Sequence, residues 1–373
     1  MGKSLEIALA AGGTAGHINP ALAVAEELRD RGHHVTFFGQ NRRLEGTLVP
    51  EAGYDFVNID VMGFDRARPW TLVSALLKMR KAKSDLSKLF GEKGAPDVAC
   101  GFGAYVEMAL LDWCKAQKVP YLIHEQNSVP GLANKTCAKG AATVCLSMPG
   151  ARPAFDGRVG ATTKVIVTGN PVRRSVIEAS HDEGRAAFRV PADATMLLVF
   201  GGSLGARHLN DAVVAIKDEL LARPNLYIVH STGKELFDEV VAEARLTEEE
   251  SSRWQIMPYI DNMGQALAAA DAVISRAGAS SIAEIAALHV PSLLVPYPLA
   301  TADHQTTNAR YLTDAGAAIL VPDDELDTDA FKSNLLALAD DAERREQMRT
   351  AAMSLGQDQA AKVLADELEA VVS

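Results

Sequence analysis

Short apolar runs alternate with amphipathic segments along the first half of the chain. Residues 5–10 form a short, mostly apolar run, residues 20–31 carry apolar side chains at helical spacing, and residues 35–39 are mostly apolar again. Further short apolar runs follow at 57–61, 98–102, 121–124, 144–146 and 165–168. Short apolar runs that alternate with helical patterns predict parallel strands that are covered by helices on both faces.

The same pattern starts again near residue 196. The apolar run 196–200 is followed by the glycine-rich loop GGSLG (201–205) and a helical pattern at 206–221, as the first run is followed by GGTAG (12–16). Further runs lie at 226–230, 254–257, 272–275, 292–296 and 318–321. We therefore predict an α/β protein with two Rossmann-like, doubly wound parallel-sheet domains. A deep cleft between the domains is expected, with ligands at the carboxyl ends of the strands. Gly and Pro at 169–171 interrupt the pattern and mark the boundary.

Composition places this chain among ordinary globular proteins. It has 373 residues, of which 48% are apolar, and 48 acidic side chains against 37 basic ones give a net charge of −11. An acidic chain is a poor candidate for binding nucleic acid, whose phosphates require a basic surface. The four cysteines show no paired spacing and no secretory signal is recognisable, so we expect a cytoplasmic protein with reduced thiols.

The first glycine-rich loop indicates an anionic ligand, because glycines let a ligand approach the backbone and the following helix offers free N–H groups. The fingerprint of a dinucleotide-binding loop is incomplete, since Ala11 stands at its first glycine position. The second predicted strand also lacks the expected acid at its end. Arg42 and Arg43 stand there instead and could bind the phosphate of NADP. An NADP-dependent oxidoreductase or a nucleotide-sensing module therefore remains an alternative.

Two residues are candidates for a general base. His17 lies in the first turn of a predicted helix, where the positive end of the helix dipole favours a neutral imidazole that can accept a proton. Glu125, in the motif HEQN (124–127), could act as a base or bind a polyol. Alternatively, His17 only caps its turn, and HEQN is a polar loop that caps the helix near Pro130. Ser128 stands where a zinc motif would need histidine, so we expect no metal there.

The second half of the chain carries two motifs suited to a nucleotide sugar. The small residues of SRAGASSIAE (275–284) would let a flat group approach the backbone, and Glu284 could accept hydrogen bonds from two ribose hydroxyls. The polar residues of DHQTTN (303–308) could bind a sugar. Each motif alone is weak evidence, because helix caps use the same residue types.

Residues 66–93 combine eight basic side chains with only two acidic ones, which leaves the rest of the chain with a net charge of −17. Apolar residues lie between the basic ones, as in helices that bind anionic membrane surfaces. The alternative is an ordinary helix whose apolar stripe packs on the sheet. The candidate membrane-binding residues are Trp70, Lys78, Arg80, Lys81 and Lys83.

Seven motifs, in this order, resemble the MurG family of glycosyltransferases along essentially the whole chain. They are GGTAGHINP (12–20), GFGAY (101–105), HEQN (124–127), GNPVR (169–173), GGSLGARHLN (201–210), SRAGASSIAE (275–284) and DHQTTNA (303–309). The resemblance implies a GT-B fold with an acceptor- and membrane-facing domain at 1–168 and a UDP-sugar-binding domain at 169–345. Residues 346–373 would form a helix that returns to the first domain.

The implied reaction is an inverting transfer of N-acetylglucosamine from UDP-N-acetylglucosamine. The acceptor would be the C4 hydroxyl of the muramoyl sugar in undecaprenyl-pyrophosphoryl-MurNAc-pentapeptide, a step of peptidoglycan synthesis that supports cell-wall growth, cell shape and division. The resemblance implies a peripheral protein on the cytoplasmic face of the cell membrane. It implies no required cofactor, although a divalent cation could stimulate transfer without a dedicated site. Another enzyme of the same fold, such as a UDP-N-acetylglucosamine 2-epimerase or a different lipid glycosyltransferase, is the alternative.

The resemblance also assigns roles to individual residues. His17 is the first choice of base and Glu125 the second. Loop 12–17 would contact the acceptor pyrophosphate, and the transferred sugar or the acceptor would be contacted by Thr14, Ala15, Gly16 and Asn127. The donor diphosphate would be bound by loop 201–205 with Ser203 and Arg173, uracil by the backbone at Ile260, and ribose by Glu284. The region of the donor sugar would be lined by Ala279, Ser280, Ser281, Ile282, Ala283, His304, Gln305 and Asn308.

Overall fold

The computed structural model of the chain describes residues 3–63, 70–202, 205–355 and 357–372. The chain divides into two compact units, one formed by Met1–Arg173 with Gln359–Ser373 and the other by Arg174–Asp358. The sequence suggested boundaries after 168 and 345. In the structure the first unit extends to Arg173, and helix α16 (Ala342–Met353) belongs to the second unit.

The first unit contains a seven-stranded sheet in which every pair of neighbouring strands is parallel, in the order β3-β2-β1-β4-β5-β6-β7. This arrangement confirms the prediction from the apolar runs, and the strand order reverses direction at β1, where ligands of such sheets bind. The strands are β1 (Glu6–Ala10), β2 (His34–Gly39), β3 (Asp55–Asn58), β4 (Val98–Gly101), β5 (Tyr121–Glu125), β6 (Thr143–Leu146) and β7 (Lys164–Val167).

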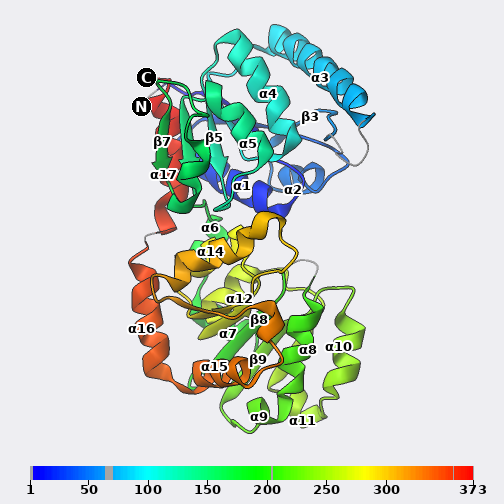
Figure 1. Ribbon diagram of the computed structural model, residues 1–373, viewed down its shortest axis with the longest axis vertical. Coiled ribbons are helices and arrows are strands. Elements are labelled where there is room, and N and C mark those ends of the chain that lie inside the picture. The colour runs from blue at the N-terminus through cyan, green and yellow to red at the C-terminus, as the bar shows by residue number, and fades with distance from the viewer. Residues whose placement is uncertain (1–2, 64–69, 203–204, 356, 373) are drawn as a thin grey trace. The chain divides into compact units, whose positions relative to one another are not determined.

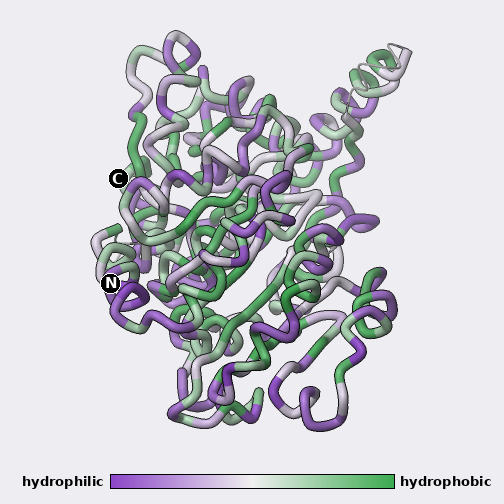
Figure 2. The backbone as a smooth tube through the Cα atoms, turned by 60° about the horizontal axis from the view of Figure 1, so that its bottom comes forward, coloured by the Kyte–Doolittle hydropathy of each residue, from purple (hydrophilic) through white to green (hydrophobic). Residues whose placement is uncertain are grey.

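Helices cover both faces of this sheet, which explains why its strands are apolar without alternation. In β1, Ile7 and Leu9 pack in one core with α1, whereas Ala8 and Ala10 pack in the other with α3 and α4. Hydrophobic and hydrophilic stretches alternate along the backbone in Figure 2. The helices of the unit are α1 (Ala15–Asp30), α2 (Glu45–Glu51), α3 (Thr71–Lys93), α4 (Ala104–Gln117), α5 (Leu132–Cys137) and α17 (Ala360–Ala370).

The last helix, α17, packs against α1 of the first unit (Figure 1). Leu364 and Leu368 are fully buried in the same core as the apolar face of α1. Arg31, at the end of α1, donates hydrogen bonds to Asp366 at 2.7 Å and to Glu369 at 3.0 Å. An apolar stripe and an ion-pair cluster therefore hold the end of the chain on the first unit.

The second unit repeats the parallel arrangement with six strands in the order β10-β9-β8-β11-β12-β13. They are β8 (Thr195–Phe200), β9 (Leu226–Ser231), β10 (Trp254–Met257), β11 (Ala272–Ser275), β12 (Ser292–Leu294) and β13 (Ala318–Leu320). The segment 206–221, expected as one helix, is interrupted at Ile216. The helices are α6 (Arg174–Ile177), α7 (His181–Ala187), α8 (Arg207–Ala215), α9 (Lys217–Leu221), α10 (Phe237–Ala244), α11 (Glu248–Ser251), α12 (Met263–Ala269), α13 (Ala279–Ala287), α14 (His304–Thr313), α15 (Asp329–Asp340) and α16.

The four cysteines are free and buried, as the sequence suggested. Burial raises the pKa of each thiol, for example that of Cys114 to about 12, so the cysteines pack as small apolar side chains. None of the helices in the described part of the chain has the length and apolarity that crossing a lipid bilayer requires.

Candidate functional site

The candidate residues of the first unit follow three neighbouring strands, β1, β4 and β5. His17 lies in the first turn of α1, two residues after Ala15, and Glu125 is the last residue of β5. Loop 102–103 leads from β4 into α4. Because the carboxyl ends of parallel strands meet at one edge of a sheet, these segments form one site at that edge.

The imidazole of His17 is held in one tautomer by the backbone. Its Nδ1 atom lies 3.0 Å from the carbonyl oxygen of Gly12, and because a carbonyl only accepts, Nδ1 carries the proton. The other nitrogen, Nε2, is therefore a proton acceptor. Removal from water lowers the pKa of His17, against the Gly12 hydrogen bond and the charges of Glu125 and Glu45, which raise it. The ring of His17 is thus held with an unprotonated Nε2, as a general base requires.

Gly103 sets the position of the His17 ring. A Cβ atom at residue 103 would lie 3.0 Å from Cδ2 and 3.1 Å from Nε2 of His17, closer than nearly all real contacts. Gly103 also has φ +95°, which other residues rarely adopt. The glycine therefore meets both a backbone and a packing requirement beside the candidate base.

The carboxylate of Glu125 is buried and bound by the backbone that follows it. Its Oε1 accepts a hydrogen bond from the amide of Asn127 at 2.9 Å. Its Oε2 accepts from the amide of Gly131 at 3.0 Å and from Asn134 Nδ2 at 2.8 Å. This geometry corresponds to the polar-loop interpretation of HEQN, because three N–H groups of the following loop and helix donate hydrogen bonds to the carboxylate.

Two buried carboxyl groups in this unit were not found from the sequence. Glu45 is 1% exposed, and its carboxylate accepts hydrogen bonds from the amides of Gly13 at 3.0 Å and Gln40 at 3.1 Å. Glu107 is fully buried, and its Oε2 accepts from the amide of Gly103 at 2.5 Å. No sequence pattern distinguishes these two acids from solvent-exposed ones, since backbone amides that accompany any residue type are their partners.

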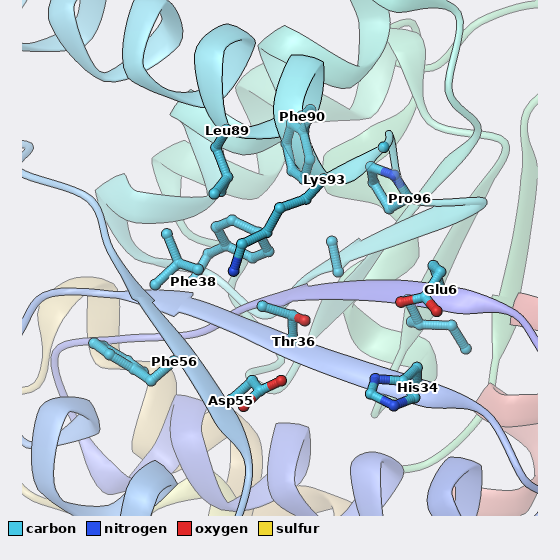
Figure 3. A pocket seen from close by; sticks show the side chains of 14 residues that line it. Glu6, His34, Thr36, Phe38, Asp55, Phe56, Leu89, Phe90, Lys93 and Pro96 are labelled. Carbon is cyan, nitrogen blue, oxygen red and sulfur yellow. The ribbon is translucent and has the colours of Figure 1, made fainter.

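A pocket of about 850 Å³ opens at this edge of the sheet. It is lined by the first glycine-rich loop together with Arg42, Arg43, Lys78 and Tyr105. A second pocket of the unit, of about 540 Å³, lies where strands β1–β3 begin and where Lys93 reaches from the end of α3 toward the sheet (Figure 3). None of the residues proposed from the sequence lines this second pocket.

The second unit has its own glycine-rich loop after β8. A Cβ atom on Gly205 would overlap the carbonyl oxygen of Thr232, and Gly205 has φ +78°, so glycine is required there. Ser203, the expected contact to the donor diphosphate, lies outside the described residues. Arg173 belongs to the first unit, where its Nε donates to Glu26 at 2.6 Å.

The motif SRAGASSIAE forms the end of β11 and the start of α13. The helix begins at Ala279 after Gly278, and the Oγ of Ser280 is buried without a hydrogen-bond partner among the described residues. Burial raises the pKa of Glu284 to about 7. Of the other candidates here, Ile282 and Ala283 face the interior, whereas Ser281 is half-buried.

Gln305 and Asn308, on α14, support the turn after β11. Gln305 Oε1 accepts hydrogen bonds from the amides of Ala277 at 3.1 Å and Tyr297 at 2.9 Å. Asn308 is fully buried and donates to the carbonyl of Ala277 at 3.2 Å. The hydrogen bonds of these two side chains hold the loops after β11 and β12 in place.

The remaining two donor-site candidates lie near the ends of other elements. His304 begins α14, and its Nδ1 lies 2.9 Å from the carbonyl of Thr301. Ile260 is buried in the loop after β10. Within the described ranges, no group of three or more His, Cys, Asp or Glu side chains is placed to hold a metal ion.

Both halves of the chain match models of one glycosyltransferase family. Residues 7–146 match the glycosyltransferase family 28 N-terminal domain, and residues 196–368 match the glycosyltransferase family 28 C-terminal domain. Among solved structures, MurG of Acinetobacter baumannii is similar with a TM-score of 0.73 and 26% identity, over 97% of this chain and 99% of that one. The calicheamicin glycosyltransferase CalG4 is similar in fold, with a TM-score of 0.70 and 17% identity over 99% of this chain and 98% of that one.

Curated relatives are similar over almost their whole length. A protein of Halothermothrix orenii is 38% identical over 368 residues, which is 98% of each chain. One of Salinibacter ruber is 38% identical over 374 residues, covering 99% of this chain and 97% of the relative. Both are named UDP-N-acetylglucosamine–N-acetylmuramyl-(pentapeptide) pyrophosphoryl-undecaprenol N-acetylglucosamine transferase.

Proposed function

The chain belongs to the family of UDP-N-acetylglucosamine–N-acetylmuramyl-(pentapeptide) pyrophosphoryl-undecaprenol N-acetylglucosamine transferases, the MurG family, and we propose that it catalyses the transfer that this name describes. N-acetylglucosamine passes from UDP to the C4 hydroxyl of the muramoyl sugar, with inversion in one displacement. The observation that carries the proposal is the 38% identity to these transferases over 98% of both chains. The alternative of an NADP-dependent oxidoreductase is wrong, because both halves match glycosyltransferase models.

In this reaction His17 is the base that removes the proton of the attacking hydroxyl. Its Nδ1–H is bound to the Gly12 carbonyl, so Nε2 can accept that proton. The negative charges of Glu125 and Glu45 then stabilise the imidazolium that forms. Glu125 is a weaker candidate because its carboxylate is bound by the amides of Asn127 and Gly131 and by the Asn134 side chain. A positioned base contributes roughly 10²- to 10⁴-fold to such a step.

The second unit binds the donor. The glycine-rich loop 201–205 precedes α8, and N–H groups there, with Ser203 and Arg173, stabilise the diphosphate of the departing UDP. Glu284 accepts hydrogen bonds from the ribose, and the backbone at Ile260 contacts uracil. Ser280, with its unpartnered Oγ, and Gln305, whose amide nitrogen remains to donate, contact the sugar region. We propose that this transfer requires no metal ion.

Helix α3 is the surface through which the protein reaches its lipid-linked acceptor at the cytoplasmic face of the membrane. Trp70 just before the helix and Val73, Leu76 and Leu77 within it are 70%, 63%, 56% and 60% exposed. Such a cluster of large apolar side chains marks an interaction surface. Three of the basic candidates are ion-paired, Lys78 with Asp60, Lys81 with Asp85 and Lys83 with Asp112. Apolar insertion therefore contributes more than charge to this membrane contact.

The direct test is transfer of labelled N-acetylglucosamine from UDP-N-acetylglucosamine to a short-chain analogue of the acceptor. Folded protein that transfers no label would overturn the proposal. For the base, His17→Ala should lower kcat about 10²- to 10⁴-fold at saturating donor. His34→Ala, which changes an exposed histidine at the start of β2, is the matched control. A near-normal kcat for His17→Ala would remove His17 from this role.

A further inference from the structure

The pocket of about 850 Å³ in the first unit is basic, and its cations come from different elements. Arg42 and Arg43 follow β2, whereas Lys78 lies on α3. All three side chains line the pocket beside the first glycine-rich loop. Residues that are distant in the sequence therefore place positive charge around one opening.

The glycine-rich loop itself is partly occupied by a carboxylate of the same chain. The amide of Gly13 donates to Glu45 Oε2, and a Cβ atom on Gly12 would lie 2.6 Å from Glu45 Oε1. Glu45 therefore fills the position where an anionic ligand would otherwise meet the Gly13 amide. An anion in this pocket must therefore be bound mainly by side chains.

The balance of exposed charges leaves two positive charges for a ligand. Lys78 Nζ lies 2.8 Å from Asp60 Oδ1, and Arg42 Nη2 lies 3.6 Å from the same atom. Arg43 is exposed and has no ion pair within the part of the chain that the structure describes. The pocket therefore has three cations and one exposed carboxylate, that of Asp60. The carboxylate of Glu45 is not counted because backbone amides bind it. A diphosphate diester carries two negative charges. Each guanidinium group can donate two parallel hydrogen bonds to the oxygens of one phosphate.

We infer that Arg42, Arg43 and Lys78 bind the diphosphate of the lipid-linked acceptor, an inference that rests on the proposed function. Lys78, which lines this pocket, lies on the same helix as the exposed apolar side chains of Leu76 and Leu77. A lipid chain attached to the bound diphosphate can therefore leave along the apolar side chains of α3. One helix contacts both the charged and the apolar part of the acceptor.

The test compares two soluble acceptors in steady-state transfer with the full-length protein. One carries a diphosphate between the muramoyl sugar and a short lipid, and the other carries an uncharged linker of equal length. We expect Arg42→Gln and Arg43→Gln each to lower kcat/KM for the diphosphate acceptor about 10-fold, and the double variant about 100-fold. For the uncharged acceptor the change should stay below about 3-fold, and the KM for UDP-N-acetylglucosamine should not change. Inorganic pyrophosphate should inhibit the wild type competitively with the acceptor, and the double variant much less.

Lys88→Gln is the matched control, because Lys88 is an exposed lysine of α3 that does not line the pocket. If the double variant loses equal activity with both acceptors, or none with either, the inference is wrong although wild-type transfer stands. The inference is also wrong if the double variant shows a raised KM for UDP-N-acetylglucosamine and an unchanged KM for the acceptor, because the arginines would then bind UDP. If the wild type transfers to neither acceptor, the proposed function itself fails.

Discussion

Glu107 should make the stability of the first unit depend on pH, and replacing it with glutamine should remove this dependence. Burial raises the pKa of Glu107 to about 8, above its ordinary value of 4.5, although the hydrogen bond from Gly103 acts in the opposite direction. Between these two pH values the folded protein holds a proton that the unfolded chain has released. The stabilisation is therefore complete below pH 4.5 and is lost as the pH rises to about 8.

The expected magnitude follows from the pKa difference. One pKa unit corresponds to about 1.4 kcal/mol, so the interval from 4.5 to about 8 corresponds to up to about 5 kcal/mol. In Glu107→Gln the side-chain carbonyl can still accept the hydrogen bond from Gly103, and the amide nitrogen replaces the Oε1 atom that has no partner. The wild type should therefore lose stability relative to this variant by about 1.4 kcal/mol for each pH unit between 5 and 8.

The measurement is urea unfolding of both proteins at several pH values, followed by circular dichroism. Contributions of other titrating groups cancel in the difference between the two curves. Glu239→Gln is the control, and its difference from the wild type should stay constant from pH 5 to 8. The hydrogen bond from Arg207 lowers the pKa of Glu239 below its ordinary value of 4.5, so this carboxyl group is ionised in both the folded and the unfolded state. A constant difference between wild type and Glu107→Gln from pH 5 to 8 would refute the reasoning, since the buried carboxyl would then not be protonated.

Three further predictions concern Gly103, the last helix and Glu284. Gly103→Ala should lower kcat at least about 10-fold, because its Cβ would displace the His17 ring and alanine disfavours the positive φ; unchanged kcat would contradict this. Leu368→Ala, a fully buried position of α17, should lower the free energy of unfolding by about 2–5 kcal/mol in urea titrations, whereas exposed Met353→Ala should have little effect. Affinity for UDP-N-acetylglucosamine, whose diphosphate does not titrate in this range, should fall several-fold from pH 8 to 6 in calorimetry as the Glu284 carboxylate becomes protonated. Glu284→Gln should abolish this pH dependence.

The strands were predictable from the sequence because parallel strands between two helical layers must be apolar on both faces. The runs at 254–257 and 272–275 coincide with β10 and β11. The interruption at Ile216 was not predictable, because the apolar spacing continues across it. Local pattern therefore determines where strands lie, whereas the ends and breaks of helices depend on tertiary packing.

The candidate site was predictable where a residue's role depends on its place in a turn, as for His17 at the start of α1. It was not predictable where the role depends on partners from distant segments. Glu45 holds the amide of Gly13, which is 32 positions away, and Arg173 pairs with Glu26, which is 147 positions away. Nothing in the neighbourhood of either residue in the sequence indicates these contacts.

The docking of α17 on α1 has a consequence for how the protein folds during its synthesis. The second unit is formed by one continuous segment, Arg174–Asp358, and can fold while the ribosome still holds the end of the chain. The first unit needs Leu364 and Leu368 to complete its core, so its synthesis begins first but its folding finishes last. Until the final helix emerges, the apolar face of α1 is uncovered, and nascent chains at this stage should be the form that chaperones bind.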